Sequence, residues 1–110
     1  MTHHSLAHHF ESRQVQAVIE EAMLYTCACP AQLGVEILRL RELYTYQQAC
    51  ITKGETMLEV HQRIAEAARE AHDILEACLS ETLKLEGWDL ITLKMPAGLR
   101  EIQQRVLDQD

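Results

Sequence analysis

The chain has 110 residues, of which 47% are hydrophobic, 25% are charged and 5% are aromatic. This length fits a single domain over residues 1–110 rather than two. The hydrophobic share excludes a disordered chain. Four glycines and two prolines are too few for the many turns of an all-β fold, and no stretch approaches the roughly 20 apolar residues of a membrane span.

Acidic residues outnumber basic ones by seventeen to ten, which gives a formal net charge of −7. The Lys and Arg residues are scattered and never form a run of three. Because nucleic acids and anionic membranes are bound through such residues, we expect neither as a partner. The first residues lack the basic start and apolar run of a signal peptide, which favours a cytoplasmic protein with reduced thiols.

Two helices are predicted in the first half of the chain. Apolar residues three and four apart predict the first helix over about Glu11–Thr26. Proline suits the first turn of a helix and is poor in its interior. Pro30 therefore begins a second predicted helix, which runs to about Ile51.

A turn at Gly54 is predicted to separate the second helix from a third. Glycine suits the left-handed cap that ends a helix, and Thr56 with Glu59 matches a capping box for the next one. The alternative is an unbroken helix from Pro30 to Glu86. It would be about 85 Å long at 1.5 Å per residue, which is improbable in a small domain.

The third predicted helix, about Thr56–Glu86, carries apolar residues that alternate three and four apart. This spacing is typical of a coiled-coil seam over three heptads, so we expect this stripe to face a neighbouring helix. Further apolar residues leave more surface than one antiparallel neighbour covers. The predicted seam consists of Met57, Val60, Ile64, Ala67, Ala71, Ile74 and Cys78.

The end of the chain predicts an irregular segment and a short helix. Gly87 ends the third helix, and Trp88–Met95 is expected to be irregular or briefly extended. Pro96 opens a fourth helix, with Leu99, Ile102, Val106 and Leu107 on one face. The sequence thus predicts an all-α fold: an antiparallel bundle of three main helices plus a short C-terminal helix. Dimerisation would help to bury the long third helix.

Three of the four cysteines point to a possible thiolate site. Cys27 and Cys29 flank the turn before Pro30, and helix lengths bring Cys78 back to the same level. Thiolates bind zinc, copper or iron, and a helix N-terminus lowers the pKa of a thiol. The sequence leaves two interpretations open: a thiolate-bound metal or redox site, and thiols that pack as small apolar groups.

Histidines give weaker metal candidates. His4 and His8 would lie one turn apart in a helix, a spacing that suits zinc, nickel or copper, although a solvated chain terminus is the simpler explanation. His61 and His72 are too far apart along a helix to share a metal. His72 could pair with Glu76, and we expect both histidines at the surface or in a dimer contact.

The sequence favours a non-catalytic protein that acts by protein association, either with itself or with a partner helix. The expected interface residues are Ile64, Ala71, Ile74 and Cys78. The alternative is a metal-binding or redox protein built on Cys27, Cys29 and Cys78. No phosphate-binding glycine loop and no Gly-x-Ser-x-Gly motif is present, and whether the protein is an enzyme acting on a small molecule stays open.

Overall fold

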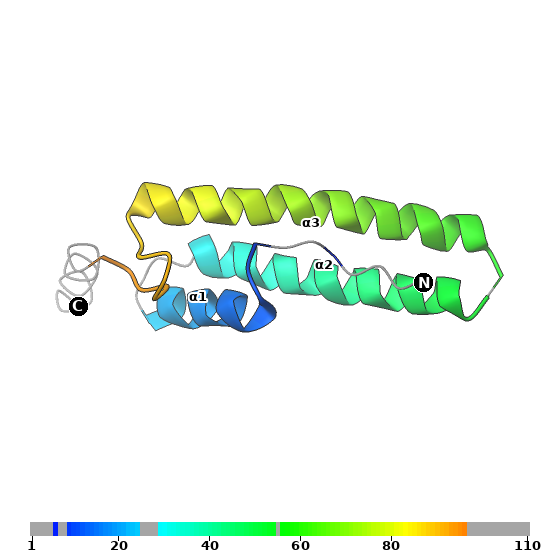
Figure 1. Ribbon diagram of the computed structural model, residues 1–110, viewed down its shortest axis with the longest axis horizontal. Coiled ribbons are helices and arrows are strands. Elements are labelled where there is room, and N and C mark those ends of the chain that lie inside the picture. The colour runs from blue at the N-terminus through cyan, green and yellow to red at the C-terminus, as the bar shows by residue number, and fades with distance from the viewer. Residues whose placement is uncertain (1–5, 7–8, 25–28, 55, 97–110) are drawn as a thin grey trace, which may run out of the picture.

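The computed structural model describes residues 6, 9–24, 29–54 and 56–96. This part of the chain folds into three helices, and its only β-type pairing is an isolated bridge between Asp89 and Lys94. Figure 1 shows two long antiparallel helices with a shorter third helix beside one of them. The predicted all-α class is confirmed over these residues. The helices are α1 (Ser12–Leu24), α2 (Cys29–Thr52) and α3 (Leu58–Glu86).

The reversal between α2 and α3 occurs at Gly54, as the sequence predicts. Gly54 has φ 69° and donates its N–H to the carbonyl of Ile51 at 3.1 Å, so the chain leaves the helix there. The unbroken helix is therefore excluded. The predicted capping box of Thr56 and Glu59 is wrong, because Met57 takes the N-cap position with φ 64° and makes no side-chain cap hydrogen bond.

The molecule is long and narrow, with extents of 57 × 27 × 18 Å. The 13 residues of α1 span about 20 Å and the 24 residues of α2 about 36 Å, so α1 covers little more than half of α2. One end of the molecule thus has three helices and the other has two (Figure 1). At Gly34, a Cβ atom would lie 2.7 Å from Ile19 Cγ1, which shows how closely α1 approaches α2.

Two apolar clusters of unequal size follow from this arrangement. The larger one joins α1, the first half of α2, the end of α3 and the C-terminal turn, with Val15, Ile37 and Leu79 at its centre. The smaller one lies between α2 and α3 and contains Tyr44, Ala65 and Ala68, with Leu6 packed against it. The apolar core is therefore concentrated at the three-helix end.

The side of α3 that contacts α2 differs from the predicted seam. The buried side chains of α3 repeat at intervals of three and four residues, as in a helix seam, but they include a histidine and a glutamate. The predicted apolar seam lies beside this buried side of the helix. Four residues of the predicted seam are exposed, so no neighbouring helix of the described chain buries them: Met57, Val60, Ile74 and Cys78. The buried residues of α3 are Ala65, Ala68, His72, Glu76, Leu79 and Leu83.

A buried ionic cluster explains this rotation of α3. Glu76 is 2% exposed, and its Oε2 accepts the backbone N–H groups of His9 at 2.6 Å and Phe10 at 2.9 Å. The same oxygen accepts from Nη2 of Arg41 at 3.2 Å. Arg41 Nε donates to Nε2 of the fully buried His72 at 3.0 Å. The expectation that His72 lies at the surface is therefore wrong.

Arg41 also holds the segment before α1. Its Nη2 donates to the carbonyl of Phe10 at 2.7 Å and its Nη1 to the hydroxyl of Ser12 at 2.8 Å. Burial lowers the pKa of Arg41, and the carboxylates of Glu76 and Glu11 oppose this effect. Arg41 lies on α2 and its hydrogen bonds end at the start of α1 and on α3, so the guanidinium links all three helices.

The residues after α3 form a compact turn on the three-helix end. Gly87 ends α3 in the left-handed conformation, as predicted. Trp88, Leu93 and Met95 are buried in the larger cluster, and Glu21 of α1, itself 2% exposed, accepts the backbone N–H of Met95 at 2.9 Å. The predicted fourth helix lies outside the described residues.

We expect Glu76→Gln to lower the free energy of unfolding by about 3 kcal/mol, because Arg41 then keeps a buried charge without its partner. Urea unfolding followed by circular dichroism measures the loss. Glu66→Gln is the matched control, since Glu66 is 59% exposed and pairs with Arg63 at 3.5 Å. It should cost less than about 1 kcal/mol. Equal losses for both variants would contradict the structural role of the buried pair.

The carboxylate of Asp89 should make the C-terminal turn sensitive to acid. It accepts the N–H groups of Thr92 and Ile91, which hold its pKa below the ordinary 3.8. A lowered pKa means that the charged form stabilises the turn above about pH 4 and that this contribution disappears as the pH falls through the lower, folded-state pKa. Fluorescence of Trp88, the only tryptophan, should report the change. Asp89→Asn should reduce this acid transition and Asp73→Asn should not.

Candidate functional site

A second stripe on α3 remains uncovered by the rest of the described chain. At 100° per residue it is centred about 120° around the helix from the side that contacts α2. Ile74 is 68% exposed, Cys78 and Ala67 are also exposed, and Ile64 and Ala71 are half-buried. We call the following residues the α3 stripe: Val60, Ile64, Ala67, Ala71, Ile74 and Cys78.

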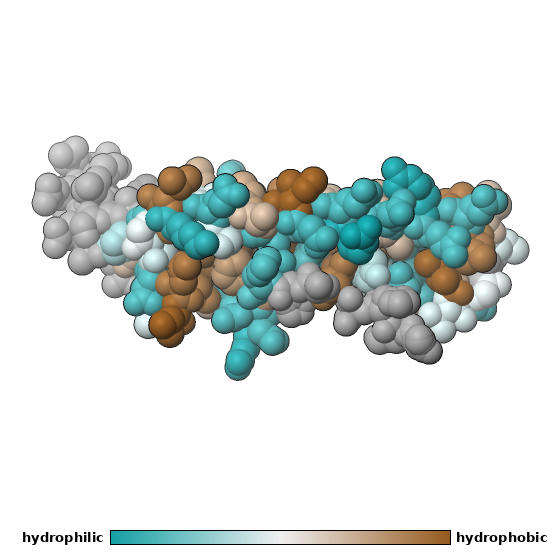
Figure 2. Space-filling model, turned by 45° about the horizontal axis from the view of Figure 1, so that its top comes forward, coloured by the Kyte–Doolittle hydropathy of each residue, from teal (hydrophilic) through white to brown (hydrophobic). Residues whose placement is uncertain are grey.

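The α3 stripe contains all four residues that the sequence predicts for an interface: Ile64, Ala71, Ile74 and Cys78. Their heptad spacing is the one that helices use to pack against each other, yet Ile74 and Cys78 are exposed and Ile64 and Ala71 are only half-buried in the described chain. Figure 2 shows apolar patches among polar ones over α3, along the upper edge of the molecule. This exposed apolar surface is the strongest candidate for a binding site.

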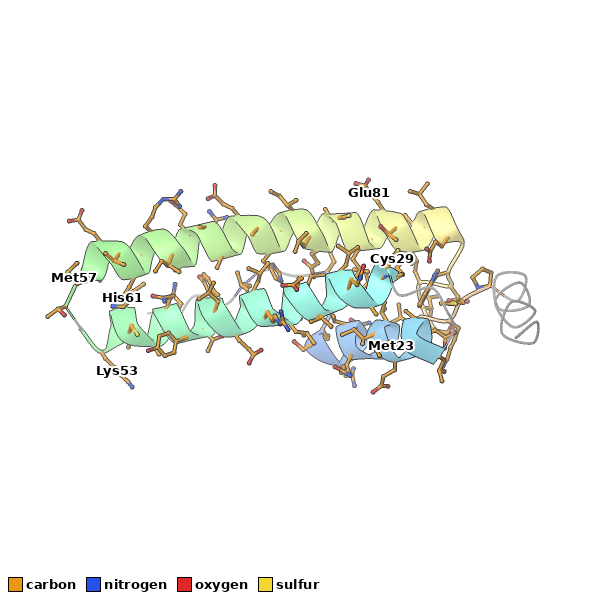
Figure 3. All side chains as sticks on the ribbon, turned by 180° about the vertical axis from the view of Figure 1, so that it is seen from behind. Met23, Cys29, Lys53, Met57, His61 and Glu81 are labelled. Atoms are coloured by element: carbon orange, nitrogen blue, oxygen red, sulfur yellow. The ribbon has the colours of Figure 1, made fainter. Side chains whose placement is uncertain are left out.

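The neighbouring surface of α2 adds apolar area on the same flank. Helical register places Leu43 and Tyr46 on the side of α2 that adjoins the stripe, and both are exposed. Between them and the stripe, His61 Nδ1 lies 2.7 Å from Oε1 of Gln47, which closes the contact between the two helices (Figure 3). Leu6 and Phe10 lie on the opposite flank, where Leu6 packs against the Tyr44 cluster and the N–H of Phe10 donates to Glu76.

Charged side chains border the α3 stripe on its outer side. Arg63 and Glu70, both more than half exposed, lie one heptad apart, with Arg63 Nη1 3.9 Å from Glu70 Oε1. Arg63 also contacts Glu66 at 3.5 Å. Exposed pairs of this kind contribute about 0–1 kcal/mol, so these side chains are free to change partners.

The predicted thiolate site stays a prediction, because the structure describes only two of its three cysteines. Cys29 lies at the N-terminus of α2 and is exposed (Figure 3). Cys78 is exposed on the α3 stripe, where its Sγ lies 3.9 Å from Oγ1 of Thr82. Cys27 lies outside the described residues, as do His4 and His8. Among the residues that are described, no group of three His, Cys, Asp or Glu could hold a metal ion.

The sequence analysis did not predict the polar cluster of Arg41, His72 and Glu76. One signal for it exists in the sequence: His72 and Glu76 are four residues apart, in register with Ala68 and Leu79. The distances show a structural cluster, since the one oxygen of Glu76 already accepts three hydrogen bonds.

An open hollow of about 290 Å³ lies between α2 and α3 on the flank opposite the α3 stripe. Its walls include Tyr44, Gln48 and Ile51, and its ionisable side chains Glu66 and Arg69 are about half exposed or more. Catalysis needs groups held in a water-excluded site. This hollow therefore provides no argument for an enzyme.

Comparison of the chain with protein-family models, with curated proteins and with solved structures gives no match. In the described residues, no helix is long and apolar enough to cross a membrane. The geometry of the α3 stripe is therefore the basis for a functional proposal.

Thiol alkylation should distinguish the described cysteines. Cys29 and Cys78 are exposed and Cys50 is buried, so in the native protein iodoacetamide should modify the first two well before Cys50. Mass spectrometry of peptides after timed alkylation measures the order, and denatured protein is the control. Slower reaction of Cys78 than of Cys50 in dilute native protein would contradict the outward position of the α3 stripe.

Proposed function

We propose that the protein acts by association with another protein through the α3 stripe and has no catalytic role. The observation that supports this is the exposure of Ile74, at 68%, within a heptad repeat that the described chain leaves only partly covered. Exposed apolar surface arranged for helix packing is typical of an interaction site.

The energy for such association comes from the apolar side chains of the α3 stripe. Full burial of an isoleucine or valine side chain contributes about 1.5–3 kcal/mol. Ile74 is the most exposed of them, and Ile64 and Val60 lie about three and four turns nearer the start of the helix. The small side chains of Ala67 and Ala71 allow a partner helix to approach closely.

The rest of the fold supports the α3 stripe as a rigid platform. The stripe lies along one side of α3, and the buried cluster of Arg41, His72 and Glu76 fixes the rotation of that helix. A preformed surface loses little conformational freedom when a partner binds. The antiparallel hairpin of α2 and α3 therefore presents the stripe ready for contact.

Ile74→Asp tests the proposal directly. A carboxylate on the α3 stripe would have to be desolvated in the contact, so we expect self-association measured by sedimentation velocity to fall at least about tenfold. Fluorescence of an apolar dye should fall as well. Ile91→Asp is the control, because Ile91 is 91% exposed on the C-terminal turn and the charge change is the same.

Two results would count against the proposal. One is a wild-type protein that is monomeric at all concentrations and binds no apolar dye. The other is association or dye binding that Ile74→Asp and Ile91→Asp change to the same extent. Circular dichroism of both variants confirms that the helices remain, since both positions are exposed and neither contributes to the core.

A further inference from the structure

The sizes of the side chains in the α3 stripe and the charges beside it identify a specific binding partner. We infer that the stripe binds the same stripe of a second copy of this chain, with the two α3 helices antiparallel and centred between residues 65 and 66. This inference rests on the proposed function and goes beyond it, because it names the partner, the direction and the register.

Side-chain size is the first argument. In this antiparallel register Ile64 lies opposite Ala67 of the second copy, and Val60 lies opposite its Ala71. A large side chain then faces a small one in these layers, which lets the helices approach closely and fill the space between them. The two-fold axis repeats each contact, so both copies use the same surface. Met57 and Ile74 meet at the two ends of the overlap.

Charge is the second argument. In an antiparallel helix pair, the residues that flank the seam on a given side of one helix lie opposite the residues that flank it on the same side of the other helix. Arg63 and Glu70 occupy these positions on the outer side of the α3 stripe. In the proposed register Arg63 of each copy faces Glu70 of the other, which gives two attractive contacts. Within one chain the two groups are 3.9 Å apart and exposed, so exchanging partners costs little.

Other alignments of the two α3 helices do not match both side-chain size and charge. A shift by one heptad places Glu70 opposite Glu70, pairs Ile64 with Ile74, and leaves Ala67 opposite Ala71. A parallel pair in register sets each alanine against its own copy. Such layers combine voids with crowded contacts, and the first alternative adds repulsion between like charges. Among these alignments, only the antiparallel pair centred between residues 65 and 66 satisfies both size and charge.

The proposed register leaves Cys78 beyond the overlap, where it stays exposed as it is in the single chain. On α2, Leu43 and Tyr46 lie on the same flank. The two-fold axis brings the α2 helices of both copies to one side of the contact. The assembly is therefore a four-helix arrangement with α3 paired to α3 and each α2 beside its own α3.

Charge-reversed variants test the direction and the register. In Arg63→Glu each contact joins two carboxylates, and in Glu70→Arg each joins two guanidinium groups. We expect each variant alone to self-associate about tenfold more weakly than the wild type. An equimolar mixture should form a heterodimer, because both contacts then join opposite charges. The double variant Arg63→Glu/Glu70→Arg should self-associate like the wild type.

Sedimentation velocity and native mass spectrometry measure these species, since the two variants differ in mass. Arg13→Glu, which changes an exposed residue of α1, is the control for the altered net charge and should associate like the wild type. Preferential heterodimer formation supports the inference. Random mixing of the two variants, with wild-type self-association that Ile74→Asp still abolishes, would overturn the antiparallel register and leave the proposed function standing.

A wild-type protein that stays monomeric up to millimolar concentration would overturn the second copy as the occupant. Dye binding then decides the proposed function separately, because an exposed stripe binds dye and Ile74→Asp abolishes that signal. Dye binding that appears only after deletion of residues 97–110 would identify the chain's own C-terminal segment as the occupant, which also overturns the inference.

Discussion

The ion pair between Arg41 and Glu76 determines which side of α3 faces α2. α3 carries two stripes at helical spacing, and only one of them can contact α2. The purely apolar stripe would bury more hydrophobic surface, but Glu76 binds the guanidinium of Arg41 and two backbone N–H groups at once. Leaving these groups unpaired in the interior would cost several kcal/mol. The stripe that combines His72 and Glu76 with alanines and leucines therefore faces inward, and the purely apolar stripe is left on the surface.

The sequence predicts much of the fold because the residues that end its helices can be identified from their immediate neighbours in the chain. Gly54 and Gly87 adopt the left-handed conformations that end α2 and α3, and α3 ends at Glu86 as predicted. The rotation of α3 could not be predicted in the same way. Hydrophobic spacing alone favours the stripe through Ile64 and Ile74, whereas the observed side depends on contacts between residues 31 to 67 positions apart in the chain.

The candidate site, like the fold, could be predicted from the sequence only in part. Ile64, Ala71, Ile74 and Cys78 were identified from their spacing alone, and the exposure of Ile74 and Cys78 supports an interface without identifying a partner. The expected meeting of thiols at the end of the hairpin assumed that Cys78 faces α2. Cys78 lies on the other side of α3 because Glu76 and Leu79 occupy the inward positions. The rotation of α3 therefore decides whether Cys78 faces α2 or belongs to the exposed α3 stripe.

The central claim is that the α3 stripe faces outward in the single chain. Hydroxyl-radical footprinting of dilute protein, read residue by residue with mass spectrometry, tests it most directly. The account predicts strong oxidation at Ile74 and at Leu85, which is 87% exposed, and protection at the fully buried Leu79 and Leu83. Protection of Ile74 together with oxidation of Leu79 in the monomer would show that α3 is rotated the other way and would contradict the account.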